Sequence, residues 1–436
     1  MRILILASAV AFGIGAAAIA VSAEAEDRAR EETFRQLELF GDVLSRIEAD
    51  YVTDADKAEL IEAAIDGMLG ALDPHSSYLS VDDFQDMQVS TSGEYGGLGL
   101  EVTMREEMVT VVSPIADTPA ERAGLESGDR IVAVDGESIL GAPLDEATDL
   151  MRGPPGEPIT ITVLRDGADP FDVDLVREII EVRSVIWEMK EELPYMRIAT
   201  FNEHTTENVL EGLADLEEAA GGALPGLILD MRSNPGGLME QSVTVAEMFL
   251  DGGEVVSTRG RDPRETRRYN ADSGDRLDGA PIFILTNAGT ASAAEIVTGA
   301  LQDRGRATVV GMPSFGKGSM QTVIPLRGGR DGALRLTTAR YYTPAGHSIQ
   351  ATGITPDVLI SARRIEGDLP RRFTEDNLRN ALENETGGER EALDPDMIEQ
   401  PPEDWDETED YVLSRAEAML REALEPQTAA MVQTQG

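Results

Sequence analysis

Two uninterrupted apolar segments constrain the fold more than any other feature of this chain. They are Leu227–Leu229 and Ile282–Leu285, and a glycine-containing turn follows each of them. Strands that are apolar at every position are typical of a sheet covered on both faces. Helical patterns alternate with these strands, near residues 206–220, 238–250 and 292–304, and a further strand is expected over Thr308–Val310. The sequence therefore predicts an α/β core over about residues 168–361.

A second kind of pattern precedes this core. Glycines cluster at Gly93, Gly96, Gly97 and Gly99. Short strands and helices are expected after them, with strands over Val109–Ile115, Arg130–Val134 and Ile159–Leu164 and helices over Pro119–Leu125 and Leu144–Met151. This pattern predicts a compact, mostly β module over residues 88–167.

The two ends of the chain have helical patterns. Residues 27–87 carry apolar residues at three-to-four spacing, and Asp73-Pro74-His75 is expected to end the second helix. Residues 362–436 are polar and acidic, and they are interpreted as a tail with one amphipathic helix. Both helical regions are candidates for pairing in a homo-oligomer, although packing on the chain's own core explains them equally well.

The first 25 residues read as an export segment. Met1-Arg2 is followed by Ile3–Ala23, an uncharged apolar run that ends in small residues. This arrangement predicts a cleaved signal peptide. The alternative is a retained anchor, because 21 residues at about 1.5 Å each just span a hydrocarbon core of about 30 Å. In both cases the remaining chain is expected outside the cytoplasm, tethered to a membrane in the second.

Composition excludes several classes of function. The chain has no cysteine and three histidines, so thiolate sites and a zinc peptidase motif are absent, and neither a metal nor another cofactor is expected. Asp and Glu outnumber Lys and Arg by 81 to 37, for a formal net charge of −44. A chain this negative repels phosphate backbones, which excludes nucleic acid as a partner.

The segment Gly311–Gly318 fits two familiar motifs poorly. As a phosphate-binding loop it has Gly318 where a Ser or Thr should hold Mg²⁺, and no helix is expected after it. As a Ser-x-x-Lys motif, Ser314 and Lys317 should share one helical turn, but Pro313 and Gly316 oppose a helix. A better interpretation is that Lys317 acts together with a serine that lies far away in the sequence.

Ser292 is the candidate for that pair. It follows a buried strand and opens a predicted helix, where its hydroxyl would lie at the end of the sheet beside free helix N–H groups. The ordinary alternatives are a helix N-cap for Ser292 and a solvated loop lysine for Lys317. A third element favours the pair: Arg232–Gly237 ends another buried strand with two glycines that suit an anion-binding nest.

Taken together, these motifs resemble the carboxy-terminal processing (tail-specific) serine peptidases. The matching segments are Arg232–Gly237, Thr290–Glu295, Gly316–Gly318 with Gln321, Gly353–Val358 and Asp73–Tyr78. The resemblance implies a peptidase core of that family and an exported serine endopeptidase located in the bacterial periplasm, secreted, or anchored to the inner membrane.

The same resemblance implies the roles of the site residues. Ser292 would be the nucleophile, Lys317 the general base and Gln321 the residue that orients the lysine amine. The backbone N–H groups of Gly237 and Ala293 would form the oxyanion hole. A lysine acts as a base only when neutral, so Lys317 is predicted to be withdrawn from water. A Ser-His-Asp triad with His204 or His347 stays an alternative, but no G-x-S-x-G motif supports it; His75 and His347 are interpreted as structural residues.

The resemblance also suggests a function for the glycine cluster. Gly97-Leu98-Gly99-Leu100 resembles the carboxylate-binding loop of a PDZ domain, which implies that protein or peptide C-termini are the substrates. The alternative function is a PDZ adaptor that binds C-termini without cutting them.

Overall fold

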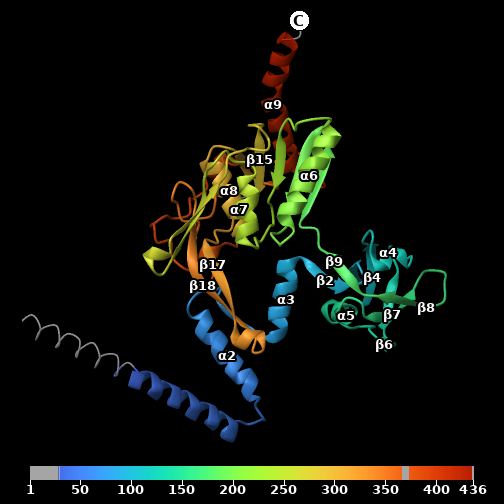
Figure 1. Ribbon diagram of the computed structural model, residues 1–436, viewed down its shortest axis with the longest axis vertical. Helices are drawn as coiled ribbons and strands as arrows, with labels where there is room; N and C mark the ends of the chain where they lie inside the picture. Colours follow the sequence, from blue (N-terminus) through green and yellow to red (C-terminus); the bar gives the residue numbers. More distant parts are fainter. Residues whose placement is uncertain (1–27, 29, 366–372, 435–436) are drawn as a thin grey trace, which may run out of the picture. The chain divides into compact units, whose positions relative to one another are not determined.

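The computed structural model describes residues 28, 30–365 and 373–434 (Figure 1). The export segment expected at residues 1–25 lies outside these residues. The chain divides into two compact units between Leu69 and Gly70. Within the described part, no helix has both the length and the apolar character that a membrane crossing requires.

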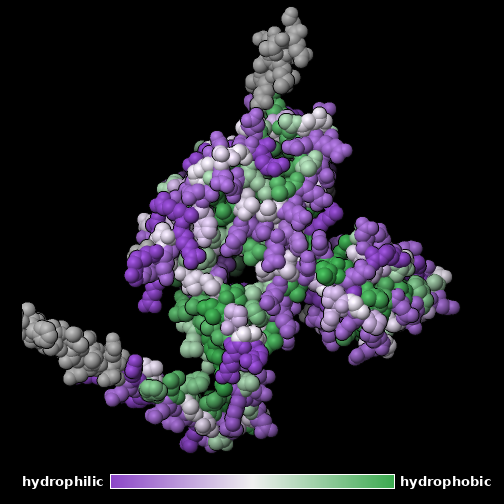
Figure 2. Space-filling model, in the orientation of Figure 1, coloured by the Kyte–Doolittle hydropathy of each residue, from purple (hydrophilic) through white to green (hydrophobic). Residues whose placement is uncertain are grey.

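The first unit is helical. Residues 30–50 form one helix, and α2 (Lys57–Gly70) begins the next. The first helix leaves large apolar side chains exposed, as the green atoms along it in Figure 2 show: Phe34, Leu37, Leu39, Phe40 and Val43. Helices with such faces are stable when another surface covers them.

The second unit opens with a short strand that the sequence did not reveal. Residues 27–87 were expected to form a helical region whose second helix ends at Asp73–His75, and no strand was expected there, but β1 (Ser77–Leu79) pairs antiparallel with β18 (Ala333–Tyr342) before α3 (Val81–Ser92) begins. The pairing partner lies about 250 residues away in the sequence, so no local pattern could indicate it. A capping box between Ser80 and Asp83 then starts α3.

The β-rich module has one antiparallel sheet in the order β3-β4-β5-β7-β8, with β6 beside β5. Its core is apolar and includes Ile159, Ile161 and Val163, the alternate residues of β7. The chain enters and leaves the module through the antiparallel pair β2 and β9. The elements of this region are β2 (Glu94–Gly97), β3 (Leu100–Arg105), β4 (Met108–Pro114), α4 (Pro119–Arg122), β5 (Arg130–Val134), β6 (Glu137–Ser138), α5 (Leu144–Met151), β7 (Pro158–Leu164), β8 (Phe171–Val176) and β9 (Glu178–Glu181).

The α/β core is built on a six-stranded sheet in the order β10-β11-β12-β15-β16-β19, parallel from β11 onward. Its residues alternate between two apolar clusters: Leu227 and Leu229 face helices α6–α8, whereas Ile228 faces α9 (Figure 1). The sheet is therefore covered on both faces, as predicted. Its elements are β10 (Val185–Lys190), β11 (Leu193–Ile198), α6 (Thr205–Ala220), β12 (Leu227–Asp230), α7 (Met239–Glu247), β15 (Ile282–Thr286), α8 (Ala293–Asp303), β16 (Thr308–Gly311), β19 (Val358–Leu359) and α9 (Tyr411–Thr434).

A second, antiparallel sheet lies in the core in the order β1-β18-β13-β14, with β17 paired to β18. The loop that carries Lys317 leads directly into β17 (Ser319–Pro325). The other strands are β13 (Gly253–Gly260) and β14 (Arg267–Ala271), and short 3₁₀ turns lie at Pro263–Glu265, Leu326–Gly329, Glu375–Asn377 and Pro395–Met397.

The C-terminal region is less separate from the core than the sequence suggested. Residues 362–436 were interpreted as an acidic tail, but one side of α9 is buried against the sheet through Val412, Ala416 and Leu420. Residues 373–390 contact the loop that carries Lys317, as described below. Their polar composition hid this role, because the contacts include hydrogen bonds from Arg390 and Glu375 as well as a ring contact between Phe373 and Phe315, whose centroids lie 6.0 Å apart.

Candidate active site

Ser292 lies at the turn between β15 and α8. Its backbone is in a strained conformation, with φ 55° and ψ −115°, that non-glycine residues rarely adopt. The residue is buried, with 8% of its surface exposed. A strained serine between a buried strand and a helix is the geometry of a nucleophile elbow, which was not visible as a G-x-S-x-G motif.

The loop after β12 lies against this turn. Ala291 N donates to the carbonyl oxygen of Asn234 at 2.9 Å, and Thr290 Oγ1 donates to that of Met231 at 2.8 Å. Gly236 approaches so closely that a Cβ there would lie 2.8 Å from Ser292 Cβ, and its φ is +103°. A side chain at position 236 is therefore excluded.

Two backbone N–H groups beside Ser292 have no acceptor among the described residues. They belong to Gly237, the next residue of this loop, and to Ala293, the first residue of α8. The first N–H groups of a helix have no partner within the helix. Unpaired donors at this position can stabilise the negative charge that develops on a carbonyl oxygen when Ser292 Oγ attacks the carbon of that carbonyl group.

Glu295 joins the Ser292 turn to the Lys317 loop. Its side chain is fully buried, and its Oε2 accepts both the Ser292 N–H, at 2.7 Å, and the Lys317 N–H, at 2.9 Å. The distance between the backbone nitrogens of Ser292 and Lys317 therefore cannot exceed the sum of these two hydrogen-bond lengths. Its Oε1 accepts from Ser314 Oγ at 2.5 Å and from Gly316 N at 2.7 Å. Burial raises the pKa of Glu295 to about 6, against the effect of these four donors.

Lys317 is partly buried in this loop. Burial lowers the pKa of its amine, and the charge of Arg335 lowers it further, whereas Glu375, Glu295 and Asp73 act in the opposite direction. A lowered pKa is the direction that a lysine needs in order to accept a proton. Among the described residues, no hydrogen bond joins the Lys317 amine to the Ser292 hydroxyl. Such bonds often form only when substrate is bound.

Gln321 has hydrogen-bond partners other than Lys317. Its Nε2 donates to Ser319 Oγ and Thr337 Oγ1, both at 3.0 Å, and no hydrogen bond in the described part joins it to Lys317. An extended chain would place residues 317 and 321 on one face, but the register of β17 shifts between Met320 and Gln321. A β-bulge changes the face to which a side chain points.

Two series of side-chain hydrogen bonds connect the segment after α2 to the residues around Lys317. In the first, Asp73 Oδ1 accepts from Thr337 Oγ1 at 3.0 Å, and Thr337 in turn accepts from Gln321. In the second, His75 Nε2 lies 2.7 Å from Oε2 of the buried Glu375. Gln350 extends the second series of hydrogen bonds. Its Nε2 donates to the Glu375 carboxylate at 2.9 Å, and its Oε1 accepts from Gly318 N at 3.1 Å.

Residues 373–390 hold the Lys317 loop from its other side. Arg390 donates from Nη1 to the carbonyl oxygen of Ser314 at 2.9 Å and from Nη2 to that of Phe315 at 2.6 Å. Glu375 N also donates to the Phe315 carbonyl oxygen, at 3.2 Å. The loop is thus fixed on one side by Glu295 and on the other by this C-terminal segment, which we call the strap (residues 373–390).

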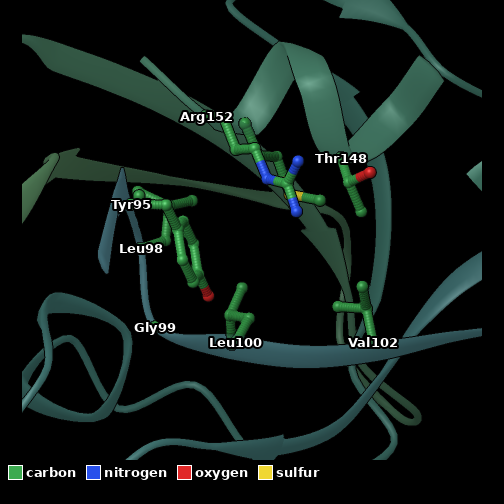
Figure 3. A pocket seen from close by; sticks show the side chains of 9 residues that line it. Tyr95, Leu98, Gly99, Leu100, Val102, Thr148 and Arg152 are labelled. Atoms are coloured by element: carbon green, nitrogen blue, oxygen red, sulfur yellow. The ribbon is translucent and has the colours of Figure 1, made fainter. Parts of the chain in front are cut away.

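The β-rich module has its own groove, lined by the loop Gly97–Leu100 together with β3 and the end of α5. Figure 3 shows Leu98, Leu100 and Val102 on one side and Thr148 and Arg152 on the other, with Tyr95 beside the loop. The groove is apolar except at Thr148, Tyr95 and Arg152. Because β3 lies at the edge of its sheet, an extended peptide in this groove could pair with it as an added strand.

Sequence models of three known families match the chain in order. That of the N-terminal domain of the activating protease CtpB matches residues 13–83, that of the PDZ domain 110–165, and that of peptidase family S41 192–360. A carboxy-terminal-processing protease from Bartonella bacilliformis is 45% identical over 400 residues, which cover 90% of this chain and 89% of that protein. The chain belongs to peptidase family S41. It is a serine peptidase with a PDZ domain, which confirms the predicted family and fold class.

Solved structures of related proteins are also similar to this S41 peptidase. A photosystem II D1 C-terminal processing protease is 32% identical, covers 73% of this chain and 91% of its own, and has a TM-score of 0.42. The PDZ domain of a carboxy-terminal protease from Vibrio cholerae, solved in complex with a peptide, is 30% identical, covers 20% of this chain and 98% of its own, and has a TM-score of 0.19.

Several residues around the site of this S41 peptidase were not singled out from its sequence. Glu295 lay within a quoted motif without a role, and its signal is its place three residues after Ser292, where a carboxylate can reach back to the serine N–H. Arg390, Glu375 and Gln350 had no such signal, because they reach the site from segments far away in the sequence.

One group of side chains among the described residues could reach a common metal ion. Glu94, Glu181 and His204 have ligand atoms within 4.8 Å of one another. They lie at the β2–β9 pair, outside the Ser292 site, and His204 Nε2 is already 2.9 Å from Glu94 Oε1. This contact between His204 and Glu94 accounts for the position of His204 without a metal ion.

Proposed function

We propose that this S41 peptidase is an exported endopeptidase that cleaves proteins near their C-termini, with Ser292 as nucleophile and Lys317 as general base. The observation that carries the proposal is the Glu295 carboxylate, which accepts the backbone N–H groups of both residues through one oxygen atom. Residues 25 positions apart in the sequence are thereby held at one place. The strained backbone of Ser292 and the lowered pKa of Lys317 support the same assignment.

The reaction would proceed through an acyl-enzyme. Ser292 Oγ attacks the scissile carbonyl carbon while the neutral Lys317 amine takes the hydroxyl proton. The resulting ammonium gives this proton to the leaving amine nitrogen as the C–N bond breaks. Water then attacks the ester, Lys317 takes a proton from the water, and Ser292 recovers a proton as the new carboxyl product leaves.

The negative oxygen of the tetrahedral intermediate needs donors that are already in place. The N–H groups of Gly237 and Ala293 are the proposed oxyanion hole, and their lack of other acceptors in the described part supports this role. Losing one donor of this kind typically costs about 2.7–4 kcal/mol of barrier. Gln321 is proposed to orient the Lys317 amine when substrate is bound.

Substrate choice is assigned to the PDZ domain. The loop Gly97–Leu100 would bind the terminal carboxylate of a protein tail, and the apolar groove would hold the last side chains. The name of the Bartonella relative describes processing at a carboxy terminus, which supports this substrate class.

Export through residues 1–25 is part of the proposal, with a periplasmic, secreted or inner-membrane-anchored product. The apolar run Ile3–Ala23 and its small-residue end support it. A tether through residues 3–23 and assembly into a homo-oligomer through the helical regions stay predictions.

The test compares the wild-type chain with three variants on a protein substrate that has a free apolar tail. Ser292→Ala should bind the substrate and release no product. Lys317→Ala and Lys317→Arg should both lose turnover, because a guanidinium stays protonated and cannot act as a base. Lys190→Arg, the same change in a strand outside the site, is the control. Near-normal cleavage by Lys317→Arg would refute the assignment.

The alternative function, a PDZ adaptor that binds tails without cutting them, makes a different prediction. A serine-directed acylating probe would then leave the chain unlabelled, and mass spectrometry would show no adduct on Ser292. The proposal expects one adduct that is absent from Ser292→Ala.

A further inference from the structure

Positive charge gathers at one place on this otherwise acidic chain. Residues 259–268 run from the end of β13 into β14, and they contain five arginines and two acidic residues. The whole chain has a formal net charge of −44. This segment therefore produces a local field of the opposite sign to that of the molecule, and a field of this kind attracts anionic groups.

Two of these arginines are free to bind such a group. Arg264 pairs with Asp262, and Arg268 pairs with Glu254. Arg259 and Arg261 are exposed, and in the part of the chain that the structure describes neither has a carboxylate within ion-pair distance. Their positive charges are therefore not neutralised by the chain itself.

The guanidinium of Arg259 is also held in place. It lies over the ring of Tyr342, 3.7 Å from the ring centroid. The tyrosine is buried, with 3% of its surface exposed, so its ring gives the guanidinium a fixed support. Stacking of this kind positions a cation without removing its charge.

Arg259 and Arg261 line a hollow of about 320 Å³ that β13, β18 and the strap form together. Arg340 of β18 adds a third guanidinium to it. Glu385 of the strap is the one carboxylate of the lining, and both Arg340 and the Tyr342 hydroxyl already donate to it. The hollow thus keeps an excess of positive charge, and this excess belongs to Arg259 and Arg261.

The hollow lies close to Lys317. Arg340 is directly opposite Ser319 of β17 on one side and Arg259 of β13 on the other, and Figure 1 shows β17 and β18 next to each other. Directly opposite residues of neighbouring strands point to the same face of a sheet. With about 4.8 Å between strands and about 3.3 Å per residue along them, the backbone of Arg259 lies about 12 Å from that of Lys317, or about four residues of extended chain.

We propose that Arg259 and Arg261 bind an acidic side chain of the substrate a few residues from the scissile bond, so that this peptidase prefers Asp or Glu there. The inference rests on the proposed cleavage at Ser292 and adds a second selection site to the PDZ domain. Guanidinium groups suit a carboxylate because their N–H donors match its two oxygens. An anionic membrane is a poorer partner, since a flat surface does not enter a hollow and the net charge of the chain repels it.

The test begins with the bond that the wild-type chain cuts in a protein with a free apolar tail, mapped by mass spectrometry. Matched substrates then carry either Glu or Gln at one position, up to about six residues on either side of that bond, with the tail unchanged. At one or two positions kcat/KM should be about fivefold higher for Glu than for Gln, which is the size expected of an exposed ion pair. In the double variant Arg259→Gln, Arg261→Gln this ratio should fall to about one.

A charge reversal and a control complete the test. Arg259→Glu should reverse the preference, so that Lys is favoured over Gln at the same substrate positions. A misfolded variant could not produce this result. Arg276→Gln changes an exposed arginine outside the hollow and should keep the wild-type ratio.

Three results would overturn the inference while the proposed peptidase function stands. The first is a ratio of about one at every position in the wild-type chain, with both substrates cleaved. The second is a wild-type ratio in the double variant. The third is an equal fall in Arg276→Gln, because overall charge would then be the cause. If the wild-type chain cuts no substrate at all, the proposed function fails, and the inference fails with it.

The membrane alternative is tested with vesicles of phosphatidylcholine that contain phosphatidylglycerol. The inference expects the wild-type chain and the double variant to sediment with them to the same extent. Sedimentation that the double variant loses, together with a Glu to Gln ratio of about one, would assign the two arginines to a membrane surface instead.

Discussion

At the scale of single residues, the acid–base properties of the site depend on charges around Lys317. Arg335 lowers the pKa of this lysine, and Glu375 raises it. Arg335→Gln should therefore raise the lysine pKa and move the acidic limb of the kcat/KM profile to higher pH. Glu375→Gln removes a negative charge, so it should move the limb to lower pH.

The control for this pair is Arg330→Gln, the same charge change at an exposed position that is not among the groups acting on Lys317. It should leave the profile in place. The measurement is kcat/KM from pH 5 to 10 with one peptide substrate. Shifts of the same sign for Arg335→Gln and Glu375→Gln would contradict Lys317 as the titrating base.

Glu295 makes the second prediction at this scale. A glutamine there has one oxygen acceptor, so two of the four donors that point at the side chain would lose their acceptor. Buried donors without partners cost about 1–3 kcal/mol each. Glu295→Gln should lower kcat/KM at least tenfold and lower the thermal midpoint, whereas the exposed Glu211→Gln should change neither. Wild-type values for both would show that Glu295 does not join the two segments.

At the scale of elements, the strap is expected to act on catalysis through the Lys317 loop. Arg390→Ala removes the donors to the Ser314 and Phe315 carbonyl oxygens, so kcat should fall and amide hydrogen exchange over residues 313–318 should become faster. Arg390→Lys keeps the charge without the forked geometry and should be intermediate. Arg379→Ala, exposed on the same strap, is the control. If Arg390→Ala kept a wild-type kcat and slow amide hydrogen exchange over residues 313–318, the strap would not act on catalysis through the Lys317 loop.

The contact between the β12 loop and the Ser292 turn gives another prediction at this scale. Gly236→Ala would place a Cβ 2.8 Å from that of Ser292, so activity should be lost. Gly274→Ala is matched, because Gly274 has φ +130° and a Cβ there would meet nothing within 4 Å. It carries backbone strain without the clash and should stay active. Equal activity of the two variants would mean that the loop can move away from Ser292.

The elements also show what the sequence could and could not reveal. The apolar strands β12 and β15 and the glycines of the β12 loop were predictable, because burial on both faces and close backbone approach have local patterns. Strand β1, the bulge in β17 and the strap were not, since each depends on a partner far away in the sequence. The sequence therefore indicated candidate residues for the site, but it did not indicate the side chains that hold them.

At the scale of the whole molecule, export makes a prediction about the mature chain. If residues 1–23 or 1–25 form a cleaved signal, the protein recovered from outside the cytoplasm should begin at Glu24 or Glu26. Intact-mass measurement after expression with its own N-terminus decides this. A chain of full mass in the membrane fraction would instead indicate the retained anchor.

The net charge of −44 makes the last prediction, because it acts on the folded chain as a whole. Like charges repel one another in a compact state, and salt screens that repulsion. The Debye length falls from about 30 Å at 0.01 M to about 10 Å at 0.1 M ionic strength. Raising NaCl over this range should therefore raise the thermal midpoint. The exposed ion pairs that salt would also weaken, such as Arg122–Glu178, contribute little to stability. Sucrose at matched osmolality is the control for effects that do not depend on charge, and a midpoint that falls with NaCl would mean that the ion pairs outweigh the net repulsion.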